Sequence, residues 1–123
     1  MDVTKFLQYG NGIRGSGNIT LMGDGVFTIK NATSNSRTWH IKYGTLNTST
    51  ANALGSESNI HLEQFGTWTV GSFTRQTIRN LHGWGTVIAD GSITINPRET
   101  NNEFLGEIRG TGTLTKNGPN EFV

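Results

Sequence analysis

Cysteine is absent from this 123-residue chain, which excludes disulfide bonds and thiolate metal sites. Charged residues make up 15% of the sequence and the formal net charge is +1, so the chain lacks a basic patch of the kind that binds nucleic acid. Apolar runs are only a few residues long, which is too short for a helix that spans a membrane. The start of the chain lacks the basic and apolar segments of a secretory signal peptide.

Hydrophobic residues are also scarce, at 33% of the chain, and this predicts a thin core within a single domain. Most ordered segments alternate apolar and polar residues, which is the period of a β-strand with one buried face. Such segments occupy residues 18–21, 26–29, 39–41, 59–62, 67–70 and 92–95. The sequence therefore predicts an all-β fold in which Trp39, Ile60 and Trp68 point into the core.

One sequence pattern occurs three times in the chain. Residues 13–23 read IRGSGNITLMG and residues 108–118 read IRGTGTLTKNG, with six of eleven positions identical, and LHGWGTV at 81–87 shares the apolar-x-Gly-x-Gly-x-apolar spacing. Such repeats favour a parallel β-solenoid of about five coils, with a β-sandwich as the alternative. The paired glycines are expected at coil corners, where a positive φ would penalise a Cβ. These glycines are Gly15, Gly17, Gly83, Gly85, Gly110 and Gly112.

A second motif, Gly-Thr-apolar, begins at Gly44, Gly66, Gly85 and Gly112. A coil of about twenty residues accounts for the first two intervals between these glycines. The third interval, from Gly85 to Gly112, is longer, and the excess is assigned to a loop at 96–102, which is rich in polar residues. Residues 1–9 are expected to form an N-terminal cap, because solenoids usually need capped ends.

The stretch 102–118, NEFLGEIRGTGTLTKNG, resembles the autotransporter-associated β-strand repeat, whose pattern is roughly Phe-x-Gly followed by Ile-x-Gly-x-Gly-x-Leu-x-Lys-x-Gly. Residues 76–87 and 44–55 are similar to segments common in the same proteins. The repeat usually continues with further glycines, whereas Asn120 replaces one of them and the sequence ends at Val123. We therefore expect the chain to be a fragment of a longer solenoid.

The resemblance implies a right-handed parallel β-helix from the secreted passenger of a Gram-negative autotransporter, exported to the bacterial outer surface. In that family the helix is mostly a stalk that displays adhesive or toxic loops, so a role in virulence as part of an adhesin is expected. The parent chain would carry an outer-membrane barrel, and the expected partner is a host-surface or matrix component. Unpaired strands at the solenoid ends also favour end-to-end self-association.

The three histidines, His40, His61 and His82, are equally spaced in the sequence, at an interval close to one coil. Apolar neighbours flank them, so all three are expected to point outward. A stacked column of imidazoles would bind a transition metal or respond to pH near 6.5. The unequal Gly-Thr-apolar intervals predict that the column slips, and solvated surface residues are the simpler interpretation. The same interval separates Lys42 from Glu63 and predicts a surface salt bridge. No metal site or cofactor is predicted.

Catalysis is not expected, because acids are sparse and no Ser, His and Asp spacing suggests a triad. The Gly-x-Gly-x-x-Gly at 10–15 precedes a predicted strand, whereas a dinucleotide site needs a helix there. Trp84 lies between two glycines and is the best candidate for a ligand contact, with the three histidines as further weak candidates. The alternative function is thus a carbohydrate- or matrix-binding module, or, less favoured, a glycoside-active enzyme with two paired carboxylates.

Overall fold

The computed structural model describes residues 2–3, 7–9, 18–29, 38–96, 101–102, 104–117 and 121–122, and every structural statement below concerns these residues. They form strands and no helix. The strands are β1 (Asp2–Val3), β2 (Leu7–Tyr9), β3 (Ile19–Leu21), β4 (Val26–Ile29), β5 (Thr38–Thr48), β6 (Asn59–Val70), β7 (Arg75–Ile78), β8 (Asn80–Gly83), β9 (Thr86–Ala89), β10 (Ser92–Ile95), β11 (Asn101–Asn102), β12 (Glu107–Arg109), β13 (Thr113–Lys116) and β14 (Glu121–Phe122).

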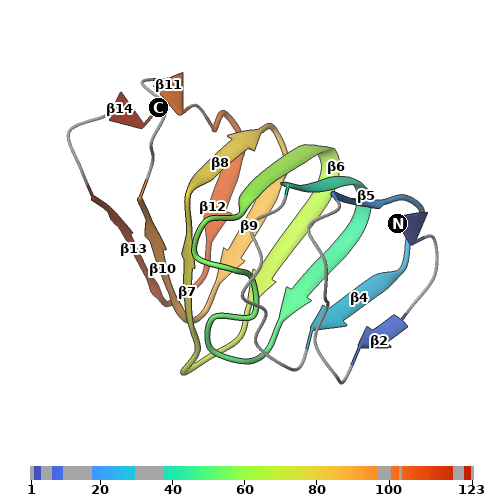
Figure 1. The fold of residues 1–123 in the computed structure, drawn as a ribbon, viewed down its shortest axis with the longest axis horizontal. Helices are drawn as coiled ribbons and strands as arrows, with labels where there is room; N and C mark the ends of the chain where they lie inside the picture. Colours follow the sequence, from blue (N-terminus) through green and yellow to red (C-terminus); the bar gives the residue numbers. More distant parts are fainter. Residues whose placement is uncertain are drawn as a thin grey trace.

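The strands wind into a parallel β-solenoid of about four turns. A first face stacks β1, β3, the first half of β5, the first half of β6 and β8. A second face stacks β2, β4, the second halves of β5 and β6, then β9 and β12. A third face holds β7, β10 and β13. The strands follow one another along the long axis of the molecule, from β2 and β4 toward β10 and β13 (Figure 1).

Parallel pairing decides between the two architectures that the sequence left open. Every strand pairing among the described residues is parallel, whereas a sandwich with tight hairpins needs antiparallel neighbours. The solenoid prediction is confirmed. The described residues complete about four turns, one fewer than the repeat spacing suggested.

The core consists of columns in which each inward residue stacks on its partner in the next coil. Ile19, Trp39, Ile60 and Leu81 form one such column, since Ile19 pairs with Trp39, Trp39 with Ile60, and Ile60 with Leu81. All four side chains are at most 2% exposed. On the second face, Phe27, Leu46, Trp68 and Val87 form another buried column. Alternation along each strand therefore places Trp39, Ile60 and Trp68 inside, as the sequence predicts.

Two kinds of constraint act on the motif glycines. Gly83 and Gly110 have φ angles of 110° and 114°, the left-handed region that disfavours a Cβ. Gly85 and Gly112 have no such φ, but a Cβ at either position would overlap a backbone carbonyl oxygen of the preceding coil, at Gly66 and Gly91 respectively. Close approach between coils, and not only turn conformation, therefore requires glycine at these corners. Gly15 and Gly17, with the Gly-x-Gly-x-x-Gly segment at 10–15, lie outside the described residues.

The repeated motif occurs at more than one corner of the coil. LHGWGTV runs from β8 to β9, between the first and second faces, whereas residues 108–114 run from β12 to β13, between the second and third. Thr113 pairs with Ser92, and the coil partner of Thr86 is Glu107. The long interval from Gly85 to Gly112 therefore joins two different corners and does not require an inserted loop, while the loop at 96–102 itself stays a prediction.

Other predicted boundaries fall partly beyond the described residues. Residues 97–100 of the predicted loop lie outside them, while Asn101–Asn102 form β11, which pairs with β14. Of the predicted cap at 1–9, only β1 and β2 are described, and both pair with the next coil through β3 and β4.

A matched glycine pair tests the corner packing. In Gly83→Ala the new methyl group would overlap the carbonyl oxygen of Leu62 at a φ of 110°, so we expect a loss of at least about 2 kcal/mol in the free energy of unfolding. In Gly71→Ala the nearest atom is the Thr48 carbonyl oxygen at 3.6 Å, an ordinary contact, and stability should be nearly unchanged. Urea denaturation followed by circular dichroism measures both; equal losses would contradict the packing described here.

Candidate functional site

The three histidines lie in one column on the outer surface of the first face. His40 pairs with His61, and His61 pairs with His82, in strict register. The rings of His40 and His61 are 4.9 Å apart between centroids, at an interplanar angle of 74°. The predicted slip is therefore wrong. The register shift between β5 and β6 falls after Ile41, downstream of the histidines, so the unequal Gly-Thr intervals do not disturb the column.

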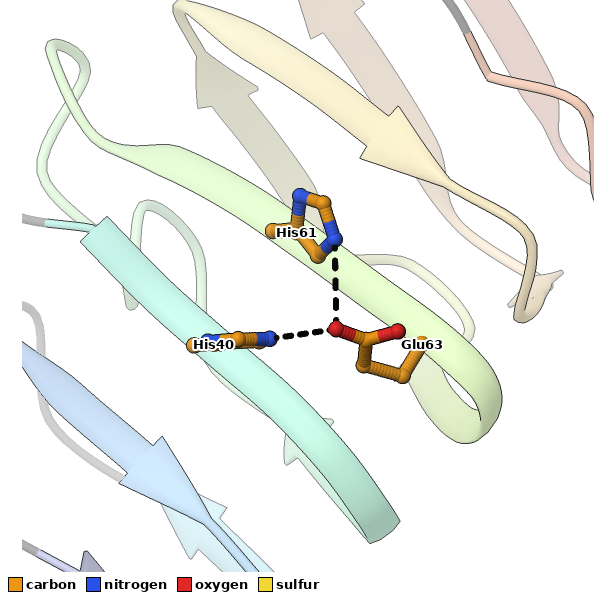
Figure 2. Close-up of polar contacts among 3 residues, drawn as sticks. All are labelled: His40, His61 and Glu63. Atoms are coloured by element: carbon orange, nitrogen blue, oxygen red, sulfur yellow. Dashed lines mark hydrogen bonds and ion pairs between the residues drawn. The ribbon is translucent and has the colours of Figure 1, made fainter.

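A carboxylate joins this column. The Oε1 atom of Glu63 lies 2.9 Å from Nε2 of His40 and 3.6 Å from Nε2 of His61. Figure 2 shows both imidazoles turned toward the same carboxylate oxygen, His40 from β5 and His61 from β6. Because an ionised carboxylate only accepts hydrogen bonds, Nε2–H of His40 is the donor. Each side chain is about one-third exposed, at 32%, 34% and 37% for His40, His61 and Glu63.

The salt bridge predicted between Lys42 and Glu63 is replaced by this arrangement. Ile41 pairs with Leu62, but Tyr43 pairs with Phe65, so the single residue Lys42 stands opposite both Glu63 and Gln64. The Glu63 carboxylate lies against His40 and His61. Lys42 acts on the carboxylate only as a more distant positive charge.

The electrostatics of the cluster favour a neutral His61 beside a charged Glu63. Partial burial lowers the pKa of His61, and the positive charges of His40 and His82 lower it further, against the attraction of Glu63. The hydrogen bond from His40 lowers the pKa of the Glu63 carboxyl, and the charges of His61, His40 and Lys42 act in the same direction. The cluster therefore presents imidazole nitrogen and carboxylate oxygen side by side near neutral pH.

Unequal corner lengths shape the surface beside the cluster. Between the first and second faces, β6 passes from Leu62 to Gly66 through Glu63, Gln64 and Phe65, whereas the next coil passes from Gly83 to Gly85 through Trp84 alone. Two open hollows lie at this corner, beside the shorter turn. One, of about 190 Å³, is lined by His61, His82, Gly83, Trp84 and Leu105. The other, of about 480 Å³, is lined by Glu63, Gln64, Trp84 and Leu105.

The same corner carries one exposed apolar side chain from each successive coil. We call this row the corner ridge, and it consists of Met22, Tyr43, Phe65, Trp84 and Leu105. Trp84 is 55% exposed and Phe65 60%. The rings of Tyr43 and Phe65 are 5.4 Å apart between centroids, and those of His61 and Trp84 are 6.1 Å apart. The ridge therefore runs directly beside the histidine–glutamate cluster, whereas Trp39 and Trp68 are fully buried.

Sequence reasoning found the histidines and Trp84, but it paired Glu63 with Lys42 and missed most of the ridge. Both had readable signals. Glu63 follows His61 by two positions and so lies on the same face of the strand. The ridge precedes the corner glycines directly, as Tyr43-Gly44, Phe65-Gly66, Trp84-Gly85 and Leu105-Gly106. Extending the Gly-Thr motif by one residue toward the N-terminus would have revealed Tyr43, Phe65 and Trp84 as its aromatic members.

Comparison with known proteins adds no assignment. No protein-family model, no curated protein and no solved structure significantly matches the chain. Among the described residues, no helix has the length and hydrophobicity needed to cross a membrane.

The pKa shifts of the cluster predict a loss of stability on acidification. His61 has a lower pKa in the folded chain than in the unfolded one, so the unfolded state binds its proton first and stability falls as the pH drops through and below about 6.5. The lowered pKa of Glu63 acts in the same direction below about 4.5. Since these side chains are partly solvated, we expect less than about 1 kcal/mol between pH 7.5 and 5.5.

Urea denaturation in EDTA at pH 7.5, 6.5 and 5.5 measures this change, and the variant His61→Gln supplies the control. The uncharged amide should flatten the profile in this range. A parent chain that becomes more stable on acidification, or a variant with the same profile as the parent, would refute the assignment to His61.

Proposed function

We propose that this chain is a non-catalytic structural segment of a secreted bacterial passenger, a stalk that presents side chains on the outer surface of the cell. The observation that carries the proposal is the uninterrupted stacking of buried residues through successive coils, as in the column from Ile19 to Leu81. Each coil supports the next, because its backbone pairs with that of the neighbouring coil and its inward side chains stack on those of the neighbour. Such a rod is suited to extend, and to fold progressively as it emerges from a membrane.

The repeat motif supports the same proposal. The residues that resemble the autotransporter-associated β-strand repeat include β12, β13 and the corner between them. At that corner Gly110 has a φ of 114°, and a Cβ at Gly110 or Gly112 would overlap the backbone of the preceding coil. The close stacking of coils in a β-helix therefore explains why the motif needs glycine at these two positions. An adhesin that contacts a host-surface or matrix component is the kind of parent protein that this stalk fits.

Export to the cell surface tests the stalk function. The chain is placed between a signal peptide and an outer-membrane translocator in a Gram-negative host, and surface antibody labelling and protease treatment of intact cells are measured. We expect the parent chain to reach the surface as a protease-resistant domain. Ile60→Asp should yield a degraded product, because a buried unpaired charge prevents stacking of the coils.

Thr67→Asp is the matched control, since it adds the same charge to the same strand on the outer surface, where the side chain is only partly covered. It should be exported and protected like the parent chain. A parent chain that fails to reach the surface, or an Ile60→Asp variant that is as protected as the parent, would refute the proposal.

The corner ridge favours a second candidate function, the binding of a polysaccharide along the solenoid. Sugar rings stack on exposed aromatic faces, and the ridge offers Tyr43, Phe65 and Trp84 on consecutive coils, whose strands lie about 4.8 Å apart. Polar groups that suit sugar hydroxyls, Glu63 and Gln64, line the hollow beside Trp84. A linear glycan that lies along the ridge would contact several coils at once.

Intrinsic fluorescence tests this binding, because Trp84 is the exposed tryptophan and Trp39 and Trp68 are buried. Soluble glucans, chito-oligosaccharides and glycosaminoglycans are titrated into the chain. A ligand of the ridge should shift the emission, and Trp84→Ala, which lacks the reporter and is therefore measured by calorimetric titration, should bind it about tenfold or more weakly. Phe73→Ala, which removes an exposed ring that does not belong to the ridge, should leave binding unchanged. An unchanged emission with the entire panel would exclude the ridge as a sugar site.

A further inference from the structure

We propose that His40, His61 and Glu63 form a binding site for a single divalent transition-metal ion such as Zn²⁺, and that the ion joins two successive coils of the solenoid. This site goes beyond the stalk function and does not depend on it.

The donor set is the first argument. Two imidazole nitrogens and one carboxylate oxygen suit zinc and its neighbours in the first transition series, whereas magnesium and calcium prefer all-oxygen sites. Three protein ligands leave a fourth position for water or for a group from another molecule. The partial exposure of all three side chains, near one-third each, gives that position access to solvent.

The distances are the second argument. Metal–ligand bonds of about 2.0–2.2 Å place the ligand atoms of a tetrahedral site about 3.3–3.6 Å apart. The carboxylate oxygen of Glu63 lies 2.9 Å and 3.6 Å from the two nitrogens, and all three ligand atoms fall within 4.8 Å of one another. Both imidazoles already direct Nε2 toward the carboxylate (Figure 2). An ion would replace the proton shared between His40 and Glu63 with little movement of any side chain.

The position of the ligands in the fold is the third argument. His40 comes from β5, while His61 and Glu63 come from β6, and these strands pair with each other and with β3 and β8 on either side. The backbone of a central strand is restrained on both edges, so the Cα atoms of His40 and His61 are fixed relative to each other before an ion binds. His40 and His61 lie a whole coil apart in the sequence, so the unfolded chain does not hold them together. Metal binding is therefore coupled to folding and should stabilise the solenoid.

His82 defines the limit of the site. It continues the column by pairing with His61, yet its ring nitrogens do not belong to the group of atoms that lie within 4.8 Å of one another. The site is thus a triad centred on Glu63 and not a ladder of three imidazoles, and this difference separates the proposal from simple affinity of histidine-rich surfaces for metals.

Calorimetric titration of ZnCl₂ into the chain, prepared without a histidine tag and freed of metal with EDTA, tests the site at pH 7.5. We expect saturable binding of one ion per chain and a rise in the melting temperature with Zn²⁺ concentration, which Mg²⁺ and Ca²⁺ should not produce. NiCl₂ gives an independent readout, because bound Ni²⁺ should quench the emission of Trp84, whose ring lies 6.1 Å from that of His61.

Three variants locate the ligands. Glu63→Gln keeps the shape of the side chain and should lower the affinity for Zn²⁺ at least tenfold, because losing even a group that only hydrogen-bonds to a metal ligand has an effect of that size. His40→Ala should do the same, and it serves as the test if Glu63→Gln does not fold, as judged by circular dichroism in EDTA. His82→Ala is the matched control and should bind Zn²⁺ like the parent chain.

The absence of saturable Zn²⁺ binding would overturn the proposal. Binding that survives both Glu63→Gln and His40→Ala, or that His82→Ala abolishes, would also overturn it, since either result would place the ion elsewhere on the histidine column.

Discussion

Backbone hydrogen bonds between successive coils fix the register of this chain residue by residue, and the other features of the structure depend on that register. β5 and β6 pair from Thr38 with Asn59 to Thr48 with Val70, with one shift between Ile41 and Tyr43. Because side chains alternate between the two sides of a strand, a slip of one residue would turn every inward residue outward. The ladder that stacks Trp39 on Ile60 inside therefore also stacks His40 on His61 outside.

The corners absorb the differences in coil length that the strands do not tolerate. At the narrow corner the carbonyl oxygen of Leu62 accepts hydrogen bonds from the backbone N–H groups of both Trp84 and Gly85, at 2.8 and 3.3 Å. The wider corner below it has room for Glu63, Gln64 and Phe65. Glu63 lies against the histidines at the start of this wider corner, and it lines the adjacent hollow together with Gln64 and Trp84. The chemistry of the surface thus arises where the regular repeat is broken.

Local sequence patterns predicted the strands, the parallel solenoid and the burial of Trp39, Ile60 and Trp68, because strand alternation and corner sterics act over a few residues. The location of each motif in the coil was not predictable in this way. The same glycine spacing avoids a clash between coils at two different corners, the one between β8 and β9 and the one between β12 and β13. From the sequence, Gly112-Thr113 was therefore assigned to the wrong corner. The contacts of Glu63 were also missed. Lys42 and Glu63 are one coil apart in the sequence, but such a spacing implies contact only where the register between neighbouring strands is constant. The register between β5 and β6 shifts directly after Ile41.

The proposed stalk function and the proposed metal site do not compete, because alternation along the strand places the buried column and the outward ligands on opposite sides. Ile60 and Leu62 face the core, while His61 between them faces solvent with Glu63 close by. A substitution at an outward position leaves the buried column intact, so surface chemistry can vary on an unchanged scaffold. Glu63 differs from the two histidines in one respect, since it lies at a corner where the chain widens. The paired strands place the two histidines of the proposed metal site, and the proposed third ligand, Glu63, lies where the register between β5 and β6 shifts.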